Sequence, residues 1–280
     1  MKRTTTLDSK IRGSLLGFAI GDAMGATTEF MTAREIQKRY RVLMDIRGGG
    51  WLNLEPGQVT DDTQMMLCVF NAIKQGGDKQ EVLKGICERF RAWADSSPPD
   101  IGGACARAIY GTNTTDPEAW MQANAQRQGR IGQSDYGNGG LMRCLVPCLL
   151  NDRDLAIRQS TLTHTNTLCD LTVHIYFHAL EDALNGVKPV DIFHHKPIGH
   201  VVDTERNAEF WLGSTDTFEG AIIGAVNDGG DADTIAALTG GLAGAYYGIE
   251  AIPSRWIRQL NSEIVTQLME VADYILANRK

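Results

Sequence analysis

The feature that most constrains the fold is a pair of acidic clusters far apart in the sequence. Thr60-Asp61-Asp62-Thr63 and Asp231-Ala232-Asp233-Thr234 each lie where a loop is expected to become a helix. Carboxylates that folding brings into one dry pocket repel one another and lose hydration, so cations must neutralise them. Oxygen ligands without histidine or cysteine favour hard divalent ions, Mg²⁺ or Mn²⁺, over zinc or copper. The sequence therefore favours a fold in which both clusters meet around a pair of metal ions.

Each cluster alone has a simpler interpretation. Acidic residues in the first turn of a helix cap its free N–H groups and complement its dipole. The metal-site interpretation is favoured because the pattern occurs twice, flanked by threonine and followed by an apolar helix each time. An EF-hand is excluded, since no Gly and Glu stand at the sixth and twelfth positions from Asp228 or Asp231.

Composition narrows the class of protein. The chain has 280 residues, is 43% hydrophobic and carries a formal net charge of −7, so nothing electrostatic favours a nucleic acid or an anionic membrane as partner. No segment approaches the ~18 apolar residues of a membrane span, and we expect a cytoplasmic monomer. The six cysteines form no CxxC pair, which is typical of reduced, buried thiols.

Helical periodicity dominates the chain, and we expect a single all-α domain over residues 1–280 without internal repeats. The predicted helices are 9–25, 32–40, 62–75, 79–95, 101–111, 140–150, 153–162, 167–185, 203–212, 217–227, 234–247 and 262–278. The 113–136 stretch is interpreted as a polar excursion within that domain.

A glycine stripe runs along the first predicted helix. Gly13, Gly17, Gly21 and Gly25 recur every four residues, at a cost in helix propensity of ~1 kcal/mol each. The helix after the second acidic cluster is also rich in glycine and alanine. We expect the two helices to pack closely near the site.

Two loops are suited to an anionic ligand. Asp100-Ile101-Gly102-Gly103 opens a helix whose free N–H groups could meet a phosphate, and Gly137-Asn138-Gly139-Gly140-Leu141-Met142-Arg143 repeats the arrangement with an arginine one turn in. The chain contains no P-loop, Rossmann fingerprint or G-x-S-x-G motif, so nucleotide triphosphate hydrolysis, dinucleotide binding of that kind and serine-hydrolase chemistry have no support.

A set of motifs, taken in order, resembles the ADP-ribosylglycohydrolases. The motifs are GFAIGDAMGATTE (17–29), GGGW (48–51), GQVTDDT (57–63), PDIG (99–102), GNGGLMR (137–143), TH (163–164) and NDGGDADT (227–234). The resemblance covers about residues 10 to 260. Glu29-Phe30-Met31-Thr32 and Gly49-Gly50-Trp51-Leu52 resemble the bacterial branch that removes ADP-ribose from arginine of dinitrogenase reductase.

The resemblance implies a compact, orthogonal helical domain with a binuclear metal cleft. Its metal ligands, for two Mn²⁺ or Mg²⁺ ions, would be Thr60, Asp61, Asp62, Asp231, Asp233 and Thr234. Its substrate-binding positions would be Ile101, Gly102, Gly137, Asn138, Gly139, Met142, His164 and His200. His200 stands where the family tends to place a larger aromatic residue against adenine, so stacking there is expected to be weaker.

Cleavage of an N-glycosidic bond needs a positioned sugar, a water molecule and help for the leaving group. Two metals could orient the ribose hydroxyls and activate the water, with Asp61 and Asp233 shared between them. Glu29 or Asp100 would serve as general acid/base. Which of these carboxylates does so stays open.

The resemblance also implies the partners. The substrate would be an ADP-ribosylated protein, the nitrogenase iron protein, and a PII-type protein could regulate the enzyme. The alternatives are hydrolysis of another ADP-ribosyl linkage (O-acetyl-ADP-ribose, serine-linked or DNA-linked) and a non-catalytic protein that reads ADP-ribose.

Overall fold

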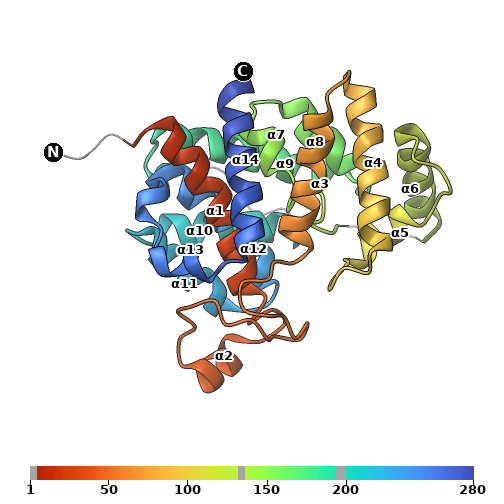
Figure 1. Cartoon of the computed structure of the whole chain (residues 1–280). Coiled ribbons are helices and arrows are strands. Elements are labelled where there is room, and N and C mark those ends of the chain that lie inside the picture. Colours follow the sequence, from red (N-terminus) through yellow and green to blue (C-terminus); the bar gives the residue numbers. More distant parts are fainter. Residues whose placement is uncertain (1–4, 132–135, 193–199) are drawn as a thin grey trace. The chain divides into compact units, whose positions relative to one another are not determined.

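The protein is a set of helices joined by loops (Figure 1), and its computed structural model describes residues 5–131, 136–192 and 200–280. Side chains of residues 128–131, 200–203 and 205–206 are outside this description. Within the described residues, β pairing is confined to two isolated bridges, Thr32 with Gly229 and Gly49 with Leu54. The all-α class predicted from the sequence is confirmed.

The described chain divides into two compact units, each treated by itself below. The first comprises residues 5–60, 178–192 and 203–279, and the second comprises 61–131, 136–177, 200–202 and 280. The first unit contains α1 (Leu7–Gly25), α2 (Ala33–Tyr40), η1 (Pro189–Asp191), most of α10 (His200–Gly213), α11 (Phe218–Asp228), α12 (Ala232–Tyr247), η2 (Ile249–Ala251), α13 (Ser254–Gln259) and α14 (Ser262–Asn278). The second contains α3 (Asp61–Gln75), α4 (Lys79–Asp95), α5 (Gly103–Ile109), α6 (Pro117–Ile131), α7 (Leu145–Leu149) and α8 (Arg153–Thr161), and α9 (Thr167–Asn185) supplies residues to both units. The single domain over 1–280 stays a prediction.

The core of the first unit is the antiparallel pair α1 and α12, which are buried on nearly every face. Each glycine of the α1 stripe lies against the α12 backbone: Gly13 at Gly244, Gly17 at Gly240, Gly21 at Ala236 and Gly25 at Ala232. A Cβ added at Gly21 would lie 2.0 Å from the carbonyl oxygen of Ala236. The predicted close packing of the two small-residue helices is confirmed.

Other helices cover this pair. Within the first unit, α11 packs on α12 and α14 packs on α1. Thr6 caps α1 by accepting a hydrogen bond from the Ser9 N–H at 3.1 Å, one of the four that a helix start leaves without a partner. Because Gly25 contacts Ala232, the end of α1 and the start of α12 lie side by side, and the candidate site lies there.

The second unit is organised around α3 and α4, which pack on each other, while α7 packs on α3 and α5, α6 and α8 pack on α4. A capping box begins α4, in which Asp78 and Glu81 satisfy each other's backbone N–H groups. The six cysteines, all within the described residues, form no disulfide, and all but the half-buried Cys68 are buried.

The interpretation of 113–136 as a polar excursion was wrong over 117–131, which form α6. Asp116 caps this helix by accepting from the Ala119 N–H at 2.9 Å, and proline occupies its first position, where no N–H is needed. Trp120 is fully buried and donates to the Thr114 carbonyl at 2.6 Å. The segment is polar in composition, so sequence reasoning overlooked that Trp120 fixes the helix to the core.

No helix among residues 5–131, 136–192 and 200–280 combines the length and the apolar character that a membrane crossing requires.

Candidate active site

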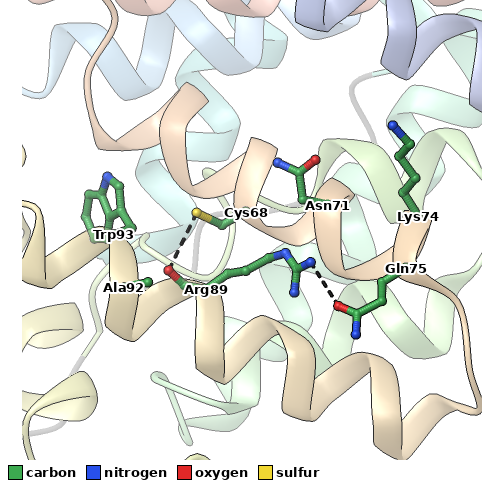
Figure 2. A pocket seen from close by; sticks show the side chains of 7 residues that line it. All are labelled: Cys68, Asn71, Lys74, Gln75, Arg89, Ala92 and Trp93. Atoms are coloured by element: carbon green, nitrogen blue, oxygen red, sulfur yellow. Dashed lines mark hydrogen bonds between the residues drawn. The ribbon is translucent and has the colours of Figure 1, made fainter.

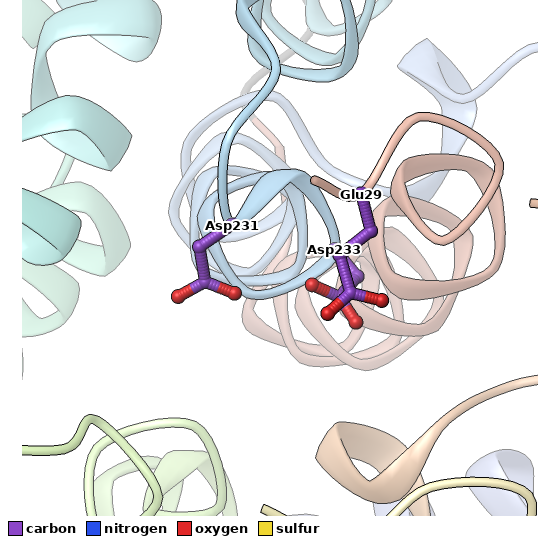
Figure 3. Close-up of side chains that lie close together, drawn as sticks. All are labelled: Glu29, Asp231 and Asp233. Atoms are coloured by element: carbon purple, nitrogen blue, oxygen red, sulfur yellow. The ribbon is translucent and has the colours of Figure 1, made fainter. Parts of the chain in front are cut away.

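Three carboxylates gather in the first unit where α1 ends and α12 begins (Figure 3). Glu29 follows α1, Asp231 is the N-cap residue of α12 and Asp233 lies in its first turn. One carboxylate oxygen from each lies within 4.8 Å of the other two. Glu29 and Asp233 are buried, at 6% and 2% exposure, and Asp231 is half-buried. Three such charges repel one another strongly unless a cation lies between them.

Backbone contacts fix this arrangement. Gly25 lies so close to α12 that an added Cβ would be 2.3 Å from the carbonyl oxygen of Ala232. The Phe30 N–H donates to the Gly230 carbonyl at 2.7 Å, and the Gly230 N–H donates to the Met31 carbonyl at 2.9 Å. These bonds join the segment after α1 to the loop before α12, which explains why residues 29 and 231 meet.

The first acidic cluster begins at Thr60, which Asp22 holds from within α1. The backbone N–H and the hydroxyl of Thr60 donate to one carboxylate oxygen of Asp22, at 2.9 and 2.8 Å. Both residues are fully buried. A threonine hydroxyl that donates its hydrogen in this way turns its lone pairs elsewhere, as a metal ligand must. Sequence reasoning missed Asp22, although a charge inside an otherwise apolar helix was a signal.

The second unit holds the next part of that cluster. Asp61 and Asp62 form the first turn of α3 and are buried, at 5% and 1% exposure. The Gly102 N–H lies 3.4 Å from a carboxylate oxygen of Asp61, so a predicted metal ligand and a predicted substrate-binding position are neighbours. Asp100 and Ile101, directly before Gly102, are half-buried. Convergence of Asp61 and Asp62 with Asp231 and Asp233 stays a prediction. So do the ligand roles of Thr60 and Thr234 and the role of Asp100.

The glycine loop after α6 lies on the ring of His164. A Cβ added at Gly137 would be 2.8 Å from His164 Nε2, and one at Gly139 would be 2.8 Å from Cε1. The N–H groups of Leu141 and Met142 both donate to the Asn138 carbonyl, at 2.7 and 2.9 Å, which closes the loop into a tight turn. Larger residues at the two glycine positions would displace the imidazole.

His164 is buried and neutral. Desolvation, reinforced by the positive charges of Arg143 and Arg107, lowers its pKa to about 3. Arg143 donates to the Thr163 hydroxyl at 2.7 Å, so the hydroxyl hydrogen can go to His164 Nδ1, 2.8 Å away. That leaves the imidazole hydrogen on Nε2, a buried atom without a hydrogen-bond partner among the described residues. Nε2 is therefore suited to donate to a ligand oxygen.

Arg143 follows the glycine loop that was predicted to suit an anionic ligand, but its side chain makes contacts within the protein. Its side chain is fully buried and donates to the Gln159 side chain at 2.8 Å, the Gln159 carbonyl at 2.9 Å and the Thr163 hydroxyl. The guanidinium also lies over the Phe90 ring, 4.6 Å from its centroid. Burial lowers its pKa. Arg143 thus holds the 159–164 segment, and with it His164, in place.

The other predicted substrate-binding positions stay predictions, and the structure gives their burial. Met142 is buried beside the glycine loop, and Ile101 and Asn138 are half-buried. His200 begins α10, and its side chain lies outside the described residues. The contact of His200 with adenine therefore stays a prediction.

Comparison with known proteins gives a consistent result over nearly the whole chain. A family model described as ADP-ribosylglycohydrolase matches residues 3–206 and 191–280. The ADP-ribosyl-[dinitrogen reductase] glycohydrolase of Rhodospirillum rubrum is 36% identical over 95% of this chain and 95% of its own. The ADP-ribosylarginine hydrolase Tri1 of Serratia proteamaculans (strain 568) is 28% identical over 95% of this chain and 79% of its own. A solved structure described as an ADP-ribosylglycohydrolase-related protein complex superposes with a TM-score of 0.74 at 28% identity, covering 95% of this chain and 98% of that one.

Proposed function

Because the chain belongs to the ADP-ribosylglycohydrolase family, we propose that it hydrolyses the N-glycosidic bond between ADP-ribose and an arginine side chain of a modified protein. The observation that carries the proposal is the cluster of Glu29, Asp231 and Asp233, whose close carboxylates suit a cation-dependent site. The names of two relatives support the arginine linkage. One name gives dinitrogen reductase as the modified protein and the other gives ADP-ribosylarginine as the substrate.

The carboxylate cluster fits a hard divalent ion. Its donors are all oxygens, and a bound cation relieves their mutual repulsion. We propose that Asp231 and Asp233, together with Thr60, Asp61, Asp62 and Thr234, hold two Mn²⁺ or Mg²⁺ ions, with the Glu29 carboxylate beside them. When bound, such ions supply Lewis-acid charge and a template that orients the substrate's oxygens.

Hydrolysis forms a bond between a water oxygen and the anomeric carbon and breaks the bond from that carbon to the guanidine nitrogen. The water loses a proton and the departing guanidine gains one. A single carboxyl group can give its proton to the guanidine nitrogen and then accept the proton of the water. We assign this transfer to Asp100 or Glu29. His164 cannot be the acid near neutral pH, because its pKa is about 3, and its role is to donate from Nε2 to the bound ADP-ribose.

The backbone positions of the two glycine-bearing loops would receive the rest of the nucleotide. Ile101 and Gly102 belong to the loop beside Asp61, and Gly137, Asn138 and Gly139 form the turn on His164. Glycine at 102, 137 and 139 leaves the neighbouring backbone N–H groups accessible to phosphate oxygens.

We propose dinitrogenase reductase as the modified protein, from the name of the Rhodospirillum rubrum relative. A monomeric state, a cytoplasmic location and control by a PII-type protein are further predictions of the same assignment.

The test is release of arginine from ADP-ribosyl-arginine in the presence of Mn²⁺ or Mg²⁺. We expect Asp61→Ala and Asp233→Ala each to lower kcat by at least about 100-fold, because each removes a carboxylate on which transition-state stabilisation depends. Asp228→Ala is the matched control, since this exposed acid lies just before the second cluster and outside the proposed site. Folded Asp61 and Asp233 variants that retain wild-type rates would refute the proposal.

A comparison of substrates tests the linkage. If the wild type cleaves O-acetyl-ADP-ribose, serine-linked or DNA-linked ADP-ribose faster than ADP-ribosyl-arginine, the linkage would be reassigned.

A further inference from the structure

Two aromatic side chains stand exposed beside the carboxylate cluster of the first unit. Phe30 is 67% exposed and Trp51 is 52% exposed. Their ring centroids lie 5.3 Å apart with the planes tilted by 50°. Single exposed apolar residues are ordinary, whereas two exposed aromatic rings in contact form a larger apolar surface that a ligand could cover.

The backbone holds both rings in place at a conformational cost. Phe30 has a φ of 60°, in the left-handed region that bulky side chains rarely adopt. Its N–H is bonded to the Gly230 carbonyl in the loop before Asp231. Gly50, just before Trp51, also has a positive φ, and a Cβ there would lie 2.2 Å from the Ala26 carbonyl oxygen. Strain of this sort persists where function maintains it.

A hydrogen bond joins the aromatic pair to the proposed catalytic carboxylates. The indole N–H of Trp51 donates to a carboxylate oxygen of Glu29 at 2.6 Å. That glutamate is buried and belongs to the cluster with Asp231 and Asp233. Trp51 therefore restrains Glu29 while keeping half of its own surface open to solvent.

The chemistry that fits such a surface is a planar cation. Guanidinium is weakly hydrated and stacks on aromatic faces, and neighbouring carboxylates add charge complementarity. Phe30 also lines a hollow with Met31, Glu35, Lys38 and Arg39, where two cationic side chains accompany one carboxylate. Guanidinium is thus favoured at the Trp51–Glu29 side of Phe30 over that hollow.

We propose that Phe30 and Trp51 form the surface on which the guanidinium of the modified arginine stacks, and that the Trp51 indole positions Glu29 beside it. This inference rests on the proposed function, because it assigns the arginine end of the same substrate. It predicts that the aromatic pair distinguishes an arginine linkage from linkages whose acceptor carries no charge.

The experiment measures kcat and KM for ADP-ribosyl-arginine and the Kd for ADP-ribose alone. We expect Phe30→Ala to raise KM by about 3- to 30-fold, the factor that corresponds to one cation–π contact, with the Kd for ADP-ribose unchanged. Phe30→Tyr keeps the ring and should restore the wild-type KM. Trp51→Phe keeps a ring but loses the N–H, so we expect a lower kcat with KM changed by less than about 3-fold.

Phe210→Ala is the matched control, because Phe210 is also exposed, at 46%, and lies against Trp211 with centroids 5.1 Å apart. It should leave KM unchanged. An unchanged KM in Phe30→Ala, an equal rise in its Kd for ADP-ribose, or the same effect in Phe210→Ala would overturn the inference while leaving the proposed function intact. A wild-type protein that releases no arginine would instead refute the proposed function, and the inference with it.

Discussion

The imidazole of His164 illustrates how burial decides the chemistry of a single residue. Its ring is enclosed by the Gly137–Gly139 turn and by Thr163, and the nearby charge of Arg143 opposes protonation. A histidine held neutral in this way can donate or accept hydrogen bonds but cannot shuttle protons at physiological pH.

This burial makes stability depend on pH. The folded pKa of His164 is about 3 and the ordinary value is 6.5, so below pH 6.5 the unfolded state binds a proton that the folded state excludes. The stabilisation is complete above pH 6.5 and is lost as the pH falls toward 3. Between pH 7.5 and pH 5.0 we expect the wild type to lose about 1–2 kcal/mol more unfolding free energy than His164→Gln.

Urea unfolding at the two pH values measures this difference. The matched control is His178→Gln, which removes an exposed histidine of α9 and so separates the loss of the buried imidazole from the loss of a histidine as such. An identical pH dependence in the wild type and His164→Gln would show that the imidazole takes up its proton in the folded state.

Sequence reasoning named three carboxylates that lie together in the structure, and it missed other contacts near them for a physical reason. Glu29, Asp231 and Asp233 were predicted as site residues, and their side chains meet. Arg143 was expected near an anion, but its partners Gln159 and Thr163 lie 16 and 20 residues further along the chain, at positions that no local pattern reveals. Trp51 was quoted only as part of a motif, because a hydrogen bond to Glu29 leaves no periodic trace in the sequence.

At the scale of elements, the glycine stripe of α1 determines where the carboxylates meet. Its contacts with α12 pass from Gly244 back to Ala232 in steps of four residues as α1 advances from Gly13 to Gly25. Such a small distance between two helix backbones is open only to residues without large side chains. The last step of this register brings residue 29 near residue 231.

Gly21→Ala tests this packing. The new methyl would lie 2.0 Å from a backbone oxygen of α12, so we expect a loss of about 1–3 kcal/mol or more in unfolding free energy. Gly85→Ala is the control, because that helical glycine of α4 has its nearest neighbour at 3.4 Å, and a gain of about 0.5–1 kcal/mol is expected. Denaturant unfolding compares the two variants. Equal effects at the two positions would contradict close packing of α1 on α12.

Periodicity predicted most helices well, since apolar faces repeat wherever a helix packs on a core. The prediction of 79–95 and 167–185 matches α4 and α9 at both ends. The failures were α6 and α13, where few apolar residues repeat, and only α6 carries a capping signal, in Asp116 and Pro117. The predicted helix over 140–150 begins only at Leu145, because the glycine loop forms a tight turn before it.

At the scale of the whole molecule, the residues assigned to the site come from both units. Glu29, Asp231 and Asp233 belong to the first, and Asp61 and Asp62 open α3 in the second. The family match covers residues of both units. If the proposal is right, metal binding should depend on the carboxylates of the first unit and also on those of the second.

The most direct test is therefore a titration with Mn²⁺, followed by the electron paramagnetic resonance signal of the free ion. We predict two bound ions per wild-type chain, and a loss of affinity of about tenfold or more in both Asp61→Asn and Asp233→Asn, with Asp228→Asn unaffected. Wild-type affinity in either of the first two variants, or a wild-type protein that binds no Mn²⁺, would contradict the account.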